Sequence, residues 1–225
     1  MNRQKKKEAD TVFLVLASLF ITALVTTNII ASKFVEVDLG FKVFQISAGI
    51  LPYPITFLIT DILSEVYGRA KTQKVVVAGF VSASFTLFIL WLGAQFPAMD
   101  NSPIDQNTYQ QVFGLAPRVI ISSMLAYLVA QYIDVRLFHF WKGLTKGKYL
   151  WFRNNASTVV SQFVDSTLVV GVLFYDKMSI SEMATLILAS WLFKALVALS
   201  DTPFIYIAVY ALQKRFGLKK HQEVP

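Results

Sequence analysis

Four acidic residues and one lysine stand within stretches of the sequence that are otherwise apolar: Asp61, Glu65, Asp165 and Asp201, with Lys194. An ionised side chain in an apolar environment is costly unless it pairs or binds a polar partner. Carboxylates accept hydrogen bonds and attract cations. The excess of embedded acid therefore predicts a site for hydrogen-bond donors, for a cation or for protons.

Asp61 and Glu65 are four residues apart, so both carboxylates lie on one face if this segment is a helix. Pro52 and Pro54 precede them and remove backbone donors, which predicts a kink or break at that point. One interpretation is structural, with each acid paired to a basic residue of a neighbouring helix. The other is functional, and embedded acids favour it.

The segment 154–175 carries a polar face on an apolar helix. The face spans about half of the helix circumference, with Asp165 near its middle, and consists of Ser157, Thr158, Ser161, Gln162, Asp165 and Ser166. Tight packing with hydroxyls bonded to the helix backbone would explain Ser157 and Ser161. It would not explain Gln162 and Asp165, which we expect to face a cavity.

Lys194 and Asp201 are seven residues apart, or about 10.5 Å along a helix axis. Because direct pairing would stretch both side chains, an acid on another helix is a better partner for Lys194, and Asp165 is the candidate. A purely structural ion pair remains the alternative. Asn28 is also embedded, in the outer half of the first apolar segment.

Residues 130–134 and 161–165 share one pattern: a small residue, Gln, an aromatic residue, a β-branched residue and Asp. Such a repeat would fit a transporter built from related halves, although five positions are thin support. Asp134 lies nearer the end of its predicted helix than Asp165 does. A carboxylate near the membrane surface costs less free energy than one in the middle of the bilayer, so Asp134 does not by itself indicate a functional site.

The composition indicates a membrane protein. Of the 225 residues 55% are hydrophobic and 16% are charged, with a mean hydropathy of +0.54, whereas about a quarter of an average soluble domain is charged. Residues 11–32 and 75–99 carry no charge over 22 and 25 positions. A helix of roughly 20 apolar residues crosses a bilayer, so both segments predict membrane-spanning helices.

Four further segments reach this length if polar side chains turn toward the inside of a bundle. The sequence therefore predicts an all-α integral membrane protein, a bundle of six transmembrane helices. Their approximate limits are residues 11–33, 45–67, 74–96, 117–138, 154–175 and 183–213. Short basic tails, residues 1–10 and 214–225, flank this transmembrane domain.

Basic residues are unevenly divided between the predicted loops. Of the 21 lysines and arginines, 16 fall in the two tails and in the loops after the second and fourth helices. Because basic loops stay in the cytoplasm, we expect both termini to be cytoplasmic in a multi-pass protein of the cell inner membrane. The net charge of +7 then reflects topology and anionic lipid, and no nucleic-acid partner is expected.

Missing residue types exclude several classes of enzyme. The chain has no cysteine, and neither of its two histidines, His139 and His221, lies in the core of a predicted helix. Ser–His and Cys–His nucleophiles are therefore unavailable. No Walker A motif occurs, so ATP-driven function would need a partner chain. We expect no enzymatic activity, no metal and no cofactor.

The chain resembles the queuosine precursor transporters, also called the VUT family of vitamin-type uptake transporters, over nearly its whole length. The most specific resemblance is Pro54 followed by Asp61-x-x-Ser64-Glu65-x-Tyr67-Gly68. Weaker matches are Asn28 with Lys33, Arg153-x-x-Ala156-Ser157, Gln162 with Asp165, and Lys194 with Asp201.

This resemblance implies a six-helix carrier of the inner membrane that imports 7-cyano-7-deazaguanine and 7-aminomethyl-7-deazaguanine for queuosine synthesis in tRNA. Carboxylates could accept the N–H groups of the guanine-like edge, and amides or lysine could donate to its carbonyl. An aromatic wall is available from Tyr53, Phe57, Trp191 and Phe193. The expected substrate-binding residues are Asn28, Asp61, Glu65, Ser157, Gln162, Asp165, Lys194 and Asp201.

Two other functions stay open at the level of sequence. The chain could be the substrate-binding subunit of a multi-component vitamin importer whose ATPases are other chains. An intramembrane enzyme or an assembly factor is the less favoured alternative. Six helices make a thin carrier, which is compatible with a homodimer, and the residues do not indicate how transport would be energised.

Overall fold

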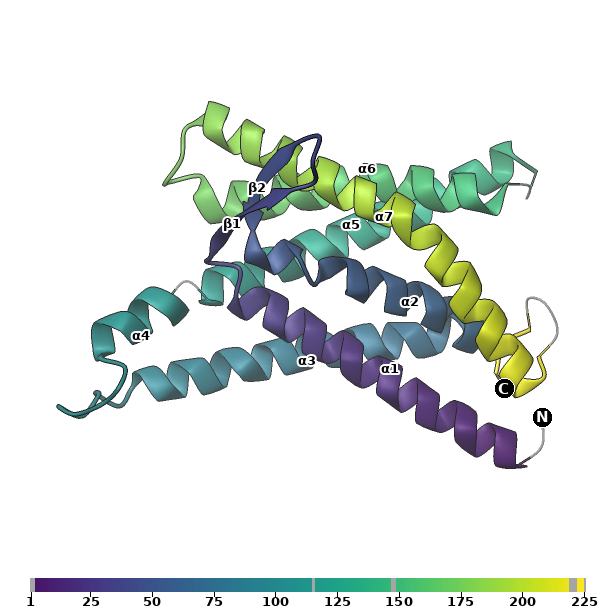
Figure 1. Ribbon diagram of the computed structural model, residues 1–225, viewed down its shortest axis with the longest axis horizontal. Helices are drawn as coiled ribbons and strands as arrows, with labels where there is room; N and C mark the ends of the chain where they lie inside the picture. The colour runs from purple at the N-terminus through teal and green to yellow at the C-terminus, as the bar shows by residue number, and fades with distance from the viewer. Residues whose placement is uncertain (1–2, 115, 147–148, 219–221, 225) are drawn as a thin grey trace.

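The computed structural model describes residues 3–114, 116–146, 149–218 and 222–224. Long helices run along the long axis of the molecule, and a small hairpin projects near one end (Figure 1). In chain order the elements are α1 (Arg3–Ile29), β1 (Phe34–Asp38), β2 (Val43–Ser47), the 3-10 turn η1 (Ala48–Ile50), α2 (Tyr53–Tyr67), α3 (Arg69–Ala94), α4 (Gln106–Phe113), α5 (Ala116–Leu144), α6 (Leu150–Phe174) and α7 (Ile180–Phe216).

Within the described ranges, six helical stretches are long and apolar enough to cross a membrane. They correspond to α1, η1 with α2, α3, α4 with α5, α6 and α7, and they confirm the predicted bundle of six helices. The helices differ from the predicted limits mainly by running further: α1 already begins at Arg3, and α7 continues to Phe216. How much of each helix lies in the bilayer stays a prediction.

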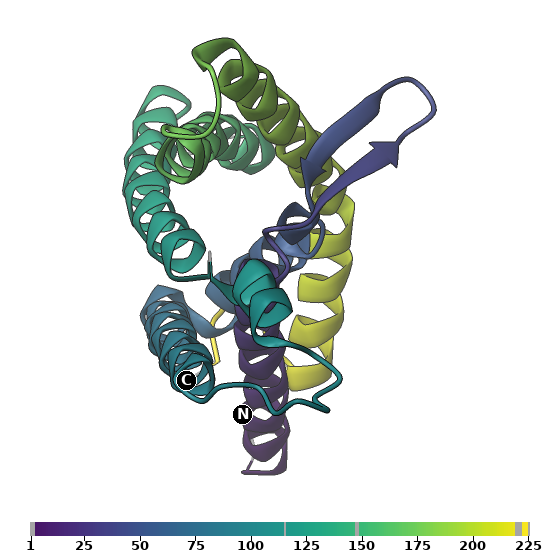
Figure 2. The same cartoon turned by 90° about the vertical axis from the view of Figure 1, so that its left-hand side faces the viewer.

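Two groups of helices meet at α7. On one side α6 packs against α5 and α7, and on the other α2 packs against α1, α3 and α7. Figure 2 shows the helices surrounding the long axis, with the hairpin projecting beside α7. α7 bends along its length (Figure 1), and Pro203 lies inside it, where the missing N–H breaks one helical hydrogen bond.

The hairpin corrects one predicted boundary, because residues 45–47 belong to a strand and not to the second helix. β1 pairs antiparallel with β2, with Phe34 opposite Ser47. Alternate side chains of β2 turn inward, as the period of a strand requires. Phe44 and Ile46 are fully buried and pack against Phe193 of α7.

The break predicted at the two prolines is confirmed. The 3-10 turn ends at Ile50, and α2 begins at Tyr53 with Pro54 in its first turn. Proline is tolerated there because the first helical N–H groups have no partner within the helix. The Ser47 Oγ donates to the carbonyl of Ala31 at 2.7 Å, which fixes the turn against the end of α1.

A single residue, Gly68, joins α2 to α3. Its φ of 84° and ψ of 157° fall in a region that is essentially restricted to glycine. The C-terminal segment packs on this elbow: the Val224 N–H donates to the carbonyl of Val66 at 2.8 Å, and Lys71 Nζ donates to the carbonyl of Val224 at 3.1 Å. The predicted basic loop after the second helix is therefore the first turns of α3.

Residues 97–116, between the third and fourth predicted helices, contain the short helix α4. Asp105 caps it by accepting from the Thr108 N–H at 2.8 Å, which also holds the pKa of this carboxyl below its ordinary value. The Tyr109 hydroxyl donates to the carbonyl of Leu90 at 3.0 Å. α4 is thereby folded back along the end of α3.

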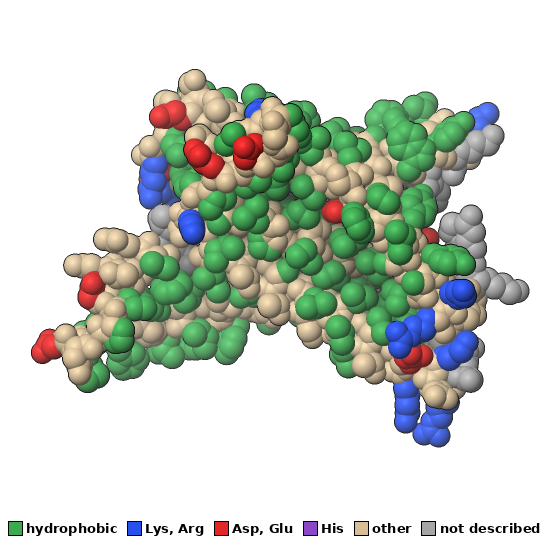
Figure 3. All heavy atoms as spheres, viewed as in Figure 1, with side chains coloured by type: hydrophobic (Ala, Val, Ile, Leu, Met, Phe, Trp, Pro, Cys, Tyr) green, Lys and Arg blue, Asp and Glu red, His purple; other side chains and the backbone are tan. Residues whose placement is uncertain are grey.

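Charge separates along the bundle. Figure 3 shows most of the visible lysine and arginine side chains at the end that holds both termini, with acidic side chains gathered at the other end. At that second end Arg118 of α5 forms a two-pronged ion pair with Asp176, at 2.7 Å for the shorter contact. The pairing holds the pKa of Asp176 below its usual value. Which end faces the cytoplasm stays a prediction.

Candidate functional site

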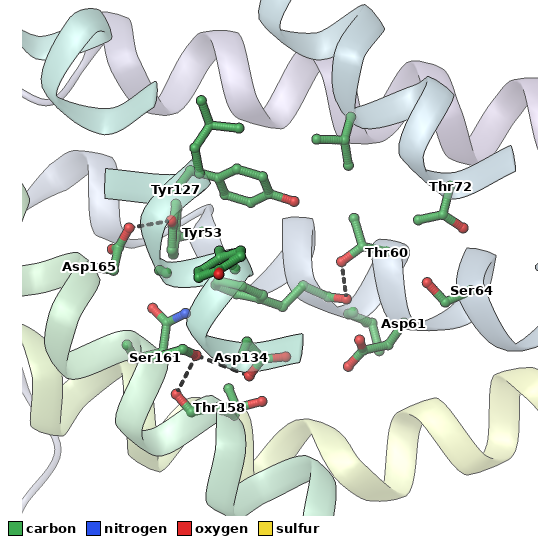
Figure 4. Close-up of a pocket in the computed structure, with 18 of the residues that line it drawn as sticks. Tyr53, Thr60, Asp61, Ser64, Thr72, Tyr127, Asp134, Thr158, Ser161 and Asp165 are labelled. Atoms are coloured by element: carbon green, nitrogen blue, oxygen red, sulfur yellow. Dashed lines mark hydrogen bonds between the residues drawn. The ribbon is translucent and has the colours of Figure 1, made fainter. Parts of the chain in front are cut away.

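A cavity of about 740 Å³ lies among α2, α3, α5, α6 and α7, within the range of roughly 300–1,000 Å³ usual for small-molecule sites. Its wall extends from Tyr53 at the start of α2 to Arg69 just beyond the end of that helix. This end of α2 lies toward the end of the bundle that holds the termini (Figure 1), and Figure 4 shows part of the lining. The polar and charged lining residues are Tyr53, Thr60, Asp61, Ser64, Arg69, Thr72, Gln73, Tyr127, Tyr132, Asp134, Arg136, Asn155, Thr158, Ser161, Gln162, Asp165 and Asp201.

The ion pair between Lys194 and Asp165 confirms the pairing predicted from sequence. Lys194 Nζ lies 2.6 Å from Asp165 Oδ2, and the two side chains expose only 8% and 1% of their surface. Tyr53 completes the cluster: its hydroxyl donates to Asp165 Oδ1 over 3.4 Å, and Lys194 Nζ lies 4.4 Å from the centre of its ring. One buried carboxylate thus joins α2, α6 and α7.

A second cavity, of about 70 Å³, lies on the other side of this cluster. Tyr53 and Asp165 line both cavities. Phe34 and Ser47 of the hairpin line only the small one, whereas Arg69 and Arg136 line only the large one. The Tyr53–Asp165–Lys194 cluster therefore separates a space on the hairpin side from a larger one that extends toward the termini.

Asp134 belongs to the wall of the large cavity, although its sequence position favoured a place near the rim. It accepts from the Ser161 hydroxyl at 3.1 Å (Figure 4). Tyr127, Ala130 and Asp134 all line the cavity, and their spacing of three and then four residues places them on one helix face. That spacing was the signal that could have identified this wall.

Gln162 presents an unused acceptor at the large cavity. Its side chain is 3% exposed, and among the described residues its Oε1 has no hydrogen-bond partner. Buried polar atoms in native proteins are nearly always paired. An amide oxygen in this position, one turn before Asp165, can accept an N–H group from a bound molecule.

The eight residues predicted to bind substrate fall into three groups. Four line the large cavity: Asp61, Gln162, Asp165 and Asp201. Two line the small cavity without reaching the large one: Asn28 and Lys194. The other two lie outside both walls: Glu65 and Ser157. The side chains of Gln131 and Arg153, which belong to the sequence motifs, lie outside the described part of the structure.

The predicted aromatic wall is half right. Tyr53 and Phe57 line the large cavity and contact each other edge to face, with 4.9 Å between ring centres. Trp191 instead donates its indole N–H to the carbonyl of Val159. The predicted place of Phe193 is also wrong, because it packs against Phe44 of the hairpin.

Tyr127 and Phe80, which the sequence analysis did not select, supply further aromatic wall. Both line the large cavity, and their ring centres lie 5.5 Å apart. They come from α5 and α3. The cavity is thus flanked by aromatic rings from three helices, α2, α3 and α5.

Comparison with known proteins places these features in a family context. Residues 47–208 match the family model described as "Putative vitamin uptake transporter". A "Probable queuosine precursor transporter" of Bacillus subtilis is 32% identical over 71% of this chain and 70% of its own. A protein of the same description from Haemophilus influenzae is 23% identical over 80% of this chain and 73% of its own. No solved structure gives a significant match.

Proposed function

The chain belongs to the family of putative vitamin uptake transporters, and on that basis we propose that it carries queuosine precursors across the cell inner membrane. The observation that most supports this substrate class is the resemblance to two relatives that are both named for it. The polar cavity inside a bundle of six apolar helices gives such a molecule a place to bind.

The proposed substrates are 7-cyano-7-deazaguanine and 7-aminomethyl-7-deazaguanine. Their guanine-like edge presents adjacent N–H donors, which a carboxylate can accept together. Asp165 and the Gln162 amide oxygen lie on the same face of α6 and supply such acceptors. The rings of Tyr53 and Phe57 offer an apolar surface for a flat heterocycle.

The other acidic residues of the large cavity would favour a cationic substrate or protons. Asp61, Asp134 and Asp201 line the same cavity as Asp165. An acidic wall attracts the cationic aminomethyl form, and its carboxylates can also take up protons.

Uptake would then run from the hairpin side toward the termini. If the basic end of the bundle is cytoplasmic, the large cavity faces the cytoplasm and the Tyr53–Asp165–Lys194 cluster closes the outer side. In this conformation a molecule released from Asp165 leaves past Arg69 and Arg136.

The experiment uses cells that cannot synthesise the deazaguanine precursor and lack other uptake routes. At low external 7-cyano-7-deazaguanine, we expect queuosine-modified tRNA only when this protein is produced. The variant Thr167→Ala is a suitable positive control, because Thr167 is exposed and its hydroxyl donates to the carbonyl of Phe163 within α6. Equal tRNA modification with and without the protein would reject the proposed substrate class.

A further inference from the structure

We propose that the side chain of Lys194 has two positions. Its ammonium group pairs with Asp165 while the site is empty, and it moves into the small cavity when a substrate binds this carboxylate. The inference rests on the proposed function in one respect, since it takes Asp165 as a ligand of the substrate. It adds a second site, in which the protein's own ammonium group is the ligand.

The geometry puts Lys194 at the boundary between the two cavities. Its Nζ contacts Asp165 Oδ2 at 2.6 Å, while its side chain lines the small cavity and not the large one. A substrate that lies in the large cavity would therefore meet Asp165 with its acceptor already occupied. The side that remains for the displaced ammonium group is the small cavity.

The small cavity contains two hydroxyl groups that are unpaired within the described part of the chain. Thr27 and Ser166 both line it, their side chains are 8% and 1% exposed, and within the described ranges their hydroxyl oxygens have no hydrogen-bond partner. Two buried hydroxyls without hydrogen-bond partners destabilise a fold, which indicates that another group binds them in a second state of the protein. The volume of about 70 Å³ exceeds the roughly 10–15 Å³ that one water molecule needs, so an ammonium group fits.

The difference between the two positions makes the movement reversible. A carboxylate is a stronger acceptor for an ammonium group than a neutral hydroxyl is. Lys194 therefore returns to Asp165 once the substrate leaves. Competition by Lys194 also lowers the affinity of the site for substrate. The hydrogen bonds that a substrate makes to Asp165 must compensate for the ion pair that it displaces.

The first test removes the acceptors of the small cavity and leaves Asp165 intact. In the double variant Thr27→Val/Ser166→Ala, the displaced ammonium group loses the two unpaired hydroxyl acceptors, so the KM for uptake of labelled 7-cyano-7-deazaguanine should rise about tenfold. The matched control Thr26→Val/Thr167→Ala changes exposed neighbours on the same two helices. Its KM should equal that of the wild type.

A cycle with Lys194→Gln separates this mechanism from a general effect on packing. Without the ammonium group, removal of the two hydroxyls should leave the KM unchanged. An unchanged KM when the hydroxyls are removed from the wild type would overturn the proposal. A rise that persists in the Lys194→Gln background would overturn it as well.

A second measurement needs no substrate and therefore stands if the proposed substrate class is wrong. In Asp165→Asn the lysine loses its anionic partner and should occupy the small cavity. The hydroxyl pair should then matter more for thermal unfolding of the purified protein in Asp165→Asn than in the wild type. Equal shifts of the melting temperature in both backgrounds would contradict the second position of Lys194, whatever the protein transports.

Discussion

Lys194 of α7 and Asp165 of α6 form an ion pair of 2.6 Å, and the two side chains expose 8% and 1% of their surface. Asp165 lines the large cavity, and the pair closes that cavity on the side of the hairpin. The same two charges thus link two helices and lie between the two cavities. Structural and functional roles can be separated by experiment.

Removing one member of the pair should destabilise the protein more than removing both. Lys194→Met or Asp165→Leu alone leaves a buried charge without its partner, which costs about 3–5 kcal/mol of unfolding free energy. The double variant removes both charges and should melt closer to the wild type in detergent. If the double variant melts as low as the worse single variant, the pair is not coupled as the geometry indicates.

The elbow between α2 and α3 should require glycine. Gly68→Ala places a Cβ where φ is 84°, a strained conformation that costs of order 1–3 kcal/mol. Thermal unfolding should therefore show a lower melting temperature. Gly143→Ala is the matched control, because Gly143 lies in α5 and a Cβ there meets no atom within 4 Å. Equal melting of Gly68→Ala and the wild type would contradict the strain argument.

The hairpin should contribute to stability through one side of β2. Phe44 is fully buried, with its ring centre 5.9 Å from that of Phe193, so Phe44→Ala should cost about 3–5 kcal/mol. Phe41 of the same hairpin is 72% exposed, and Phe41→Ala should change stability by less than about 0.5 kcal/mol. Similar melting temperatures for both variants would show that the hairpin does not pack as described.

The orientation of the bundle can be read by chemical labelling, because the natural sequence contains no cysteine. The charge bias predicts that the hairpin lies outside and the end of α7 inside. A single cysteine in Phe41→Cys should react with a membrane-impermeant maleimide in intact cells. Lys214→Cys should react only after the membrane is permeabilised. The opposite labelling pattern would reverse the proposed topology.

Hydropathy and polar spacing predicted most of the framework. Long apolar segments identified the six helices, because a bilayer admits little else. The paired prolines predicted the break before α2. The pairing of Lys194 with Asp165 followed from the cost of a buried charge, which makes a partner on another helix the favourable outcome.

Other features depend on tertiary contacts that local sequence does not encode. The strands of the hairpin are five residues each, and they are stabilised by the packing of Phe44 and Ile46 on α7. Asp134 lies near the end of its predicted span, yet it lines the cavity because α5 continues to Leu144. Sequence could not separate Asp61 from Glu65 either, since only the rotation of α2 decides which acid reaches the cavity.

The central claim is that the cavity beside Asp165 is the path of a queuosine precursor, and uptake into liposomes tests it most directly. Purified wild-type protein, reconstituted without any partner chain, should take up labelled 7-cyano-7-deazaguanine in a saturable manner. Asp165→Asn preserves the size of the side chain but loses a charge-assisted hydrogen bond, so uptake should fall roughly tenfold or more. Thr167→Ala should match the wild type. Absence of uptake by folded wild-type protein, or wild-type uptake by Asp165→Asn, would contradict the claim.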